Sequence, residues 1–118
     1  MKRICDPMIQ WGIYVVDAGT TVGAEQSGMR PAILVKEFDD VSLCLIIPLT
    51  GQLEAERFRH TIRINSTKST KLRNDSIAML YQMKSVSLNR IGKNEIGALE
   101  EYQIKNVMRG IKEMLNLQ

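Results

Sequence analysis

The chain has 118 residues and few of the histidine and cysteine side chains from which zinc sites are usually built. It contains one histidine, His60, and two cysteines, Cys5 and Cys44, which lie far apart in the sequence. A zinc site needs several such ligands at short and regular spacings, so we expect no metal ion. We expect both thiols to be reduced, because a chain that can build its own core does not depend on a disulfide.

Signatures of cofactor binding and of covalent hydrolysis are also missing. The sequence has no glycine-rich phosphate loop and no serine within a Gly-x-Ser-x-Gly turn. We therefore expect no cofactor. His60 could serve as a general base, although at the start of an exposed strand it could equally be an ordinary polar residue.

No apolar run is long enough to form a membrane span. The longest runs, such as residues 43–49, are far shorter than the roughly 18 residues that a spanning helix needs. The first three residues begin like a signal peptide, but Asp6, Pro7 and Gln10 interrupt the stretch that should be apolar. We therefore expect a cytoplasmic protein with no membrane partner.

The composition is that of a globular protein with a mild excess of positive charge. Hydrophobic residues make up 44% and charged residues 25%, and the length suits one core but not two, so residues 1–118 should form a single domain. The net charge of +3 fits a polyanionic partner such as a nucleic acid without requiring one.

Short apolar or alternating segments predict a mainly β protein. Residues 1–10 show no periodicity and should form a short tail, and residues 51–59 should form a charged loop. Residues 45–47 do not alternate between apolar and polar, so this strand should be covered on both faces. A succession of short strands favours a small barrel or sandwich. The predicted strands are residues 13–17, 32–36, 41–49, 60–65, 77–80 and 86–88.

The apolar period changes near the C-terminus, where a helix is predicted. Gly97 should mark the break before this helix, and its apolar stripe should pack on the core. Gly110 inside the helix costs about 1 kcal/mol relative to alanine unless a neighbour packs closely against it. The stripe consists of Ile104, Val107, Met108, Ile111, Met114 and Leu115.

Residues 22–31 form a polar connection between two strand-like runs. Gly23 and Gly28 permit backbone conformations that other residues avoid, so the loop can fold back over the domain and present Glu25 and Gln26. An ordinary hairpin loop would have the same composition.

Arg30 and Thr50 are the side chains best suited to phosphate chemistry. Pro31 biases Arg30 towards an extended conformation at the mouth of the next strand, and Thr50 ends a buried strand. A guanidinium group can bind two phosphate oxygens and stabilise the charge of an in-line displacement, while a hydroxyl can donate or accept. RNA carries its own nucleophile, the 2'-hydroxyl, so alignment and charge stabilisation could suffice.

Residues 22–31, which read Val-Gly-Ala-Glu-Gln-Ser-Gly-Met-Arg-Pro, closely resemble the loop of the MazF/PemK (Kid) toxin ribonucleases. The resemblance extends from about Trp11 onward, and the order and spacing of its motifs make it specific. Further matches are residues 13–17, residues 47–50 (Ile-Pro-Leu-Thr), residues 74–76 with Gln82 and Arg90, and residues 96–99.

The resemblance implies an SH3-like β-barrel with a C-terminal helix, usually a homodimer, that acts as a sequence-preferring and metal-independent endoribonuclease. Cleavage of single-stranded RNA would leave a 2',3'-cyclic phosphate and a 5'-hydroxyl. By position in the motifs, Arg30 and Thr50 match the family's catalytic pair, and Glu25, Gln26 and Gln82 match residues that line the RNA site. The plasmid-encoded branch has an arginine and an aspartate just before its glutamine, whereas Met79 and Tyr81 stand at those positions here. The mechanism of that branch is therefore not carried over.

The resemblance also implies a cognate antitoxin, whose flexible acidic segment would cover the RNA groove. A basic surface for RNA or antitoxin would be supplied by Arg57, Arg59, Lys68, Lys71 and Arg73. An ordinary solvated face is the alternative for these residues.

Two other functions are compatible with the same fold. A related toxin family poisons DNA gyrase through a C-terminal helix that ends in Trp-Gly-Ile, whereas this chain ends in Leu-Asn-Leu-Gln. A non-catalytic SH3-like module would use Arg30 and Thr50 for structure alone.

Overall fold

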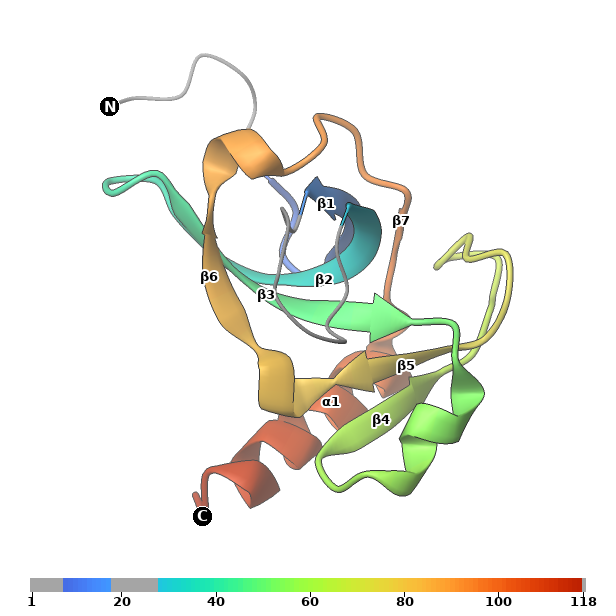
Figure 1. Cartoon of the computed structure of the whole chain (residues 1–118). Helices are drawn as coiled ribbons and strands as arrows, with labels where there is room; N and C mark the ends of the chain where they lie inside the picture. Colours follow the sequence, from blue (N-terminus) through green and yellow to red (C-terminus); the bar gives the residue numbers. More distant parts are fainter. Residues whose placement is uncertain (1–7, 18–27, 118) are drawn as a thin grey trace.

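The structure is a computed structural model that describes residues 8–17 and 28–117. Within these residues the chain is mainly β, with one α-helix at the C-terminal end, as predicted (Figure 1). The strands are β1 (Gly12–Asp17), β2 (Met29–Phe38), β3 (Leu43–Thr50), β4 (Thr61–Ile64), β5 (Ser76–Met79), β6 (Lys84–Ser87) and β7 (Gly97–Ala98). The helices are the 3-10 turns η1 (Leu53–Arg57), η2 (Leu80–Gln82) and η3 (Leu88–Arg90), and α1 (Glu101–Met114).

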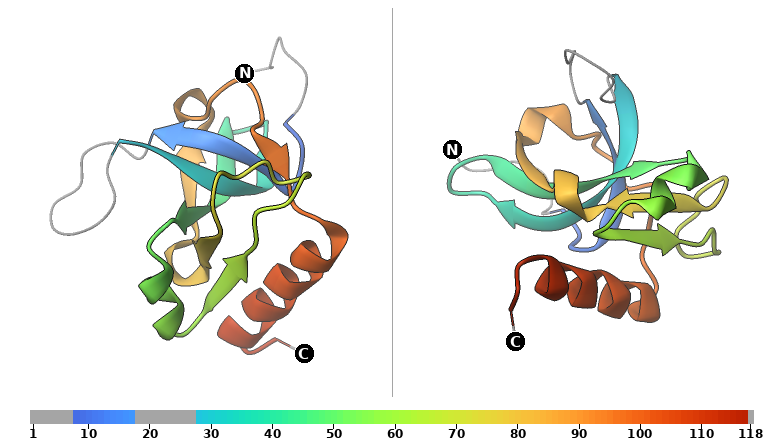
Figure 2. Two further views of the ribbon diagram at one scale, coloured as in Figure 1. Left: turned by 90° about the vertical axis from the view of Figure 1, so that its right-hand side faces the viewer. Right: turned by 60° about the horizontal axis from the view of Figure 1, so that its bottom comes forward.

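The strands form one antiparallel sheet that curls into a half-barrel. Its order is β4-β5-β3-β2-β1-β7, and β6 also pairs with β3. β3 is therefore hydrogen-bonded on both edges, to β2 on one and to β6 and then β5 on the other. α1 lies beside β4 and η2 at one end of the molecule (Figure 2). No helix of the described residues is long and apolar enough to cross a membrane.

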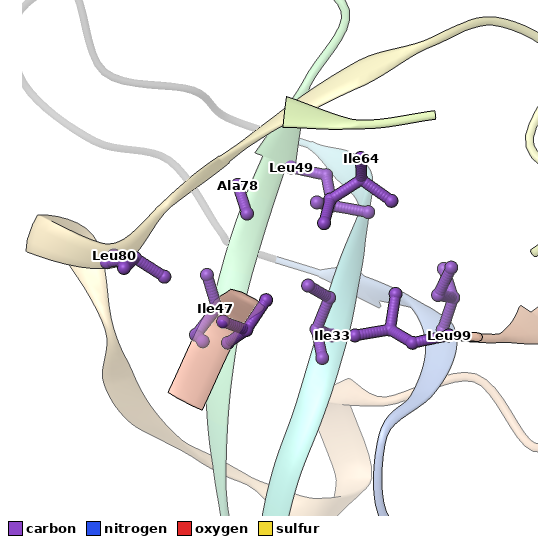
Figure 3. Packing of buried hydrophobic residues seen from close by; sticks show 9 residues of the cluster. Ile33, Ile47, Leu49, Ile64, Ala78, Leu80 and Leu99 are labelled. Atoms are coloured by element: carbon purple, nitrogen blue, oxygen red, sulfur yellow. The ribbon is translucent and has the colours of Figure 1, made fainter. Parts of the chain in front are cut away.

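Alternating residues of the central strands build a core on each face of the sheet. Ile33 and Ile47 are buried on the face that carries the cluster shown in Figure 3. Ala32 and Ile46 are buried in a second cluster on the other face, together with Cys44. The prediction that the middle strand is covered on both faces is thus confirmed.

Several predicted boundaries were wrong. β2 begins at Met29 rather than at residue 32, because pairing with β1 continues to the Asp17–Met29 pair. The turn between β2 and β3 lies at residues 39–42, and the expected loop at residues 51–59 contains η1.

The C-terminal helix packs with a narrower stripe than predicted. Val107 is fully buried, but Met108 and Leu115 are 44% and 51% exposed. Each residue turns a helix by 100°, so these two side chains lie at the margin of the face centred on Val107. A Cβ on Gly110 would lie 2.6 Å from Leu80 Cδ1, which is the close packing that explains a glycine there.

The start of α1 is tied to the loop between β4 and β5. The buried Gln103 accepts a hydrogen bond from Glu100 N (2.8 Å) and donates one to Asn65 O (3.1 Å). Gly97 lies against the carbonyl oxygens of Ser69 and Thr70, where a Cβ has no room. Both contacts join segments that lie far apart in the sequence.

We predict that Gly97→Ala lowers the free energy of unfolding by about 1–3 kcal/mol, because the methyl group would overlap fixed backbone oxygens. Urea unfolding measures the change. Gly51→Ala is the matched control, since a Cβ at Gly51 meets nothing within 4 Å. Equal stability of the two variants would contradict the close contact.

Candidate active site at the ends of β2 and β3

Arg30 is held within a strand rather than at its mouth. It pairs with Val16 of β1, and the neighbouring Pro31 pairs with Val15. The side chain of Arg30 is exposed, whereas Val16 is buried in the second core cluster. Backbone pairing therefore fixes the Cα of Arg30 and leaves its guanidinium group accessible.

Thr50 is the last residue of β3, paired with Ile77 of β5. Its side chain is 7% exposed, and its hydroxyl oxygen accepts a hydrogen bond from Gln52 N (3.2 Å). This contact orients the oxygen and leaves the hydroxyl hydrogen able to donate to a ligand.

Arg30 and Thr50 each lie two residues beyond Ala32 and Pro48, the last residues that pair between β2 and β3. Continued by two residues, the same antiparallel register would set Arg30 opposite Thr50. Because side chains alternate, both belong to the face that carries Ala32. A charged group that can bind phosphate and an oriented hydroxyl would thus stand at the rim of the second core cluster.

Gln82 belongs to the chain segment on the other edge of β3. It is half-buried at the end of η2, between β5, which pairs with Thr50, and β6, which pairs with Ile46. Three of the predicted site residues therefore come from segments around one half of β3. The other two, Glu25 and Gln26, lie outside the described residues, as does Cys5.

His60 precedes β4 instead of opening it. Its φ of 62° takes the backbone out of the extended conformation, and its carbonyl oxygen accepts a hydrogen bond from Leu80 N (3.0 Å). Among the described residues no group of three or more His, Cys, Asp or Glu side chains could hold a metal ion.

The five predicted basic residues are all exposed but form two groups. Arg57 and Arg59 precede β4, whereas Lys68, Lys71 and Arg73 follow it in the loop to β5 (Figure 1). The two groups therefore lie at opposite ends of one short strand.

An aromatic cluster beside Gln82 was not predicted. The rings of Phe58 and Tyr81 meet edge to face with centroids 6.5 Å apart, and Arg57 lies 4.7 Å from the centroid of Phe58. No local pattern links the two rings, because Phe58 directly follows η1, Tyr81 lies in η2, and they meet only in the folded chain.

A family model describing the PemK-like, MazF-like toxins of type II toxin-antitoxin systems matches residues 9–115. The chain belongs to this family. The endoribonuclease toxin MazF of Escherichia coli strain K12 is 29% identical to this toxin over 94 residues, which cover 75% of this chain and 78% of the relative.

Solved structures of other toxins have the same fold. MazF from Deinococcus radiodurans gives a TM-score of 0.71 at 14% identity and covers 91% of this chain and 94% of its own. A mycobacterial endoribonuclease in complex with its cognate antitoxin gives 0.65 at 12% identity, with coverage of 94% and 95%. The prediction of an SH3-like barrel with a C-terminal helix is confirmed by these likenesses.

We predict that Thr50→Val lowers the free energy of unfolding by about 1 kcal/mol and speeds hydrogen exchange of the Gln52 amide, because that amide loses its acceptor. Amide exchange followed by NMR checks the second effect. Thr50→Ser keeps the oxygen and should protect the amide as the wild type does. Unchanged exchange in the valine variant would show that the hydroxyl is not held in this way.

Proposed function

We propose that this toxin is a metal-independent endoribonuclease that cleaves single-stranded RNA with a sequence preference. The observation that carries the proposal is the register of β2 and β3, whose last pair, Ala32 and Pro48, lies two residues from both Arg30 and Thr50. Family membership supports it, because relatives are named as endoribonucleases. Such a substrate would place the activity in the cytoplasm.

The proposed reaction uses the 2'-hydroxyl of the RNA as nucleophile. Its oxygen forms a bond to phosphorus while the bond from phosphorus to the 5'-oxygen breaks, giving a 2',3'-cyclic phosphate and a 5'-hydroxyl. The 2'-hydroxyl loses its proton, and the departing 5'-oxygen gains one. No atom has to come from a metal-bound water or a covalent intermediate.

Arg30 would bind the non-bridging phosphate oxygens and neutralise the charge that develops on them. A guanidinium group stays protonated, so its main contribution is electrostatic, with assistance to proton transfer through its hydrogen bonds. Thr50 would position the phosphate or the 2'-hydroxyl with its oriented hydroxyl group. Glu25, Gln26 and Gln82 would line the RNA site.

The proposed partners are a cognate antitoxin and a second copy of the chain. A structural neighbour is described in complex with its cognate antitoxin, which supports the first partner. An acidic antitoxin segment would compete with RNA for the same basic groups, because both are polyanionic.

We predict that Arg30→Ala abolishes cleavage, by at least about 100-fold, while the fold is kept, because the phosphate loses its counter-charge. Wild type and variant are incubated with a long single-stranded RNA in EDTA, and the new ends are mapped. Arg109→Ala removes an exposed charge from α1 and should cut normally.

Discrete cuts with 5'-hydroxyl ends from the wild type in EDTA are the expected result. Retained cutting by folded Arg30→Ala would remove this residue from the chemistry. Absence of cutting by the folded wild type would overturn the proposal in favour of a gyrase-binding toxin or a binding module.

We also predict that the triple variant Lys68→Gln, Lys71→Gln and Arg73→Gln flattens the salt dependence of RNA binding. Each lost phosphate contact on a single strand should reduce the slope of log Kd against log salt by about 0.7. Glutamine variants of the exposed Lys105, Arg109 and Lys112 are the control. An equal slope in both sets would mean that this loop is an ordinary solvated face.

A further inference from the structure

Arg57, Phe58 and Tyr81 form an exposed cluster that we call the aromatic platform. Phe58 and Tyr81 are 49% and 45% exposed, although their rings are large and apolar. Arg57 lies 4.7 Å from the centroid of Phe58, and Tyr81 meets the same ring at an interplanar angle of 67°. Both rings therefore keep much of their surface accessible to a ligand, and Tyr81 is the one that directly precedes Gln82.

The backbone on both sides of the platform is fixed by hydrogen bonds. Phe58 N donates to Ala55 O (3.1 Å), and Phe58 O accepts from Thr61 Oγ1 (2.9 Å). Leu80, which precedes Tyr81, is fully buried in the first core cluster, and its amide donates to His60 O (3.0 Å). The backbone of the platform is thus ordered before a ligand binds, so binding costs little conformational entropy there.

Tyr81 follows β5, the strand that pairs with Thr50 on one edge of β3. Tyr81 directly precedes Gln82, and its segment continues β5, which pairs with Thr50 through Ile77. Two residues of strand, two of 3-10 helix and one strand spacing separate the backbones of Thr50 and Tyr81 by roughly 12 Å. A single strand of RNA whose phosphate lies between Arg30 and Thr50 can reach this distance within a few nucleotides.

We propose that Tyr81, supported by Phe58 and Arg57, stacks on one unpaired base of the RNA substrate near the cleavage site. This inference rests on the proposed ribonuclease function. Single-stranded RNA is commonly held by aromatic rings and by arginine planes that stack on splayed bases. The platform combines both kinds of group in a chain of net charge +3, which favours a polyanionic ligand.

The test compares binding of intact and abasic RNA by platform variants. The probe is a short RNA around a mapped cleavage site, with a 2'-deoxy nucleotide before the scissile phosphate so that it binds without being cut. Tyr81→Leu should raise Kd by about 5- to 100-fold, the range measured for loss of one stacked base. Tyr81→Phe and Tyr81→Trp should bind as the wild type does.

Abasic probes identify a stacked base directly. In the wild type one abasic position should weaken binding by a factor similar to that of Tyr81→Leu. In Tyr81→Leu the same abasic position should add less than about twofold, because the interaction is already lost. Tyr102→Leu changes a 52% exposed tyrosine on α1 and serves as the matched control. Tyr81→Met replaces the leucine variant if thermal unfolding shows that the latter is unstable.

The outcomes distinguish failure of the stacking proposal from failure of the proposed ribonuclease function. If the wild type cuts RNA but Tyr81→Leu binds the probe equally well, stacking is overturned while the ribonuclease stands, and the platform becomes a surface for a protein partner. If the abasic position weakens binding by Tyr81→Leu as much as it weakens binding by the wild type, stacking on Tyr81 is also overturned. If the wild type neither binds nor cuts RNA, both proposals fail.

Discussion

The pairing of β3 on both edges is the constraint on which the rest of the structure depends. β2 holds one edge, and β6 followed by β5 holds the other. Both core clusters include residues of β3, so both faces of the sheet are packed against it. Pro48 lies where the second edge passes from β6 to β5, a point at which a missing amide donor is tolerated. Thr50 at the end of this strand is therefore placed by the core itself.

Sequence patterns predicted the C-terminal helix and every strand of the described residues except β7, but not their partners. Short apolar runs and the stripe around Val107 report which side chains face a core, and this was enough for a barrel with a C-terminal helix. The backbone hydrogen bond at His60, the hydrogen bond between Gln103 and Asn65, and the contact of Gly97 with the loop between β4 and β5 all depend on segments distant in sequence. Local patterns carry no signal for such contacts.

The candidate site, too, was predicted from the sequence only in part. Arg30 and Thr50 were found from their chemistry and from the resemblance of their surroundings to a known family. Their proposed juxtaposition depends on the register of β2 and β3, which residue patterns alone do not define, and β2 begins three residues before its predicted start. Phe58 and Tyr81 were missed as a pair, since each alone is an unremarkable exposed aromatic residue.

The pairing of β1 with β2 ends at Asp17 and Met29, and residues 18–28 join these two residues in the sequence. Because pairing with β1 and β3 sets the backbone of β2, the position of the Arg30 Cα does not depend on the length of that connection. Under the proposed ribonuclease function, substitutions in this connection could alter contacts with RNA without moving the paired backbone that carries Arg30 and Thr50.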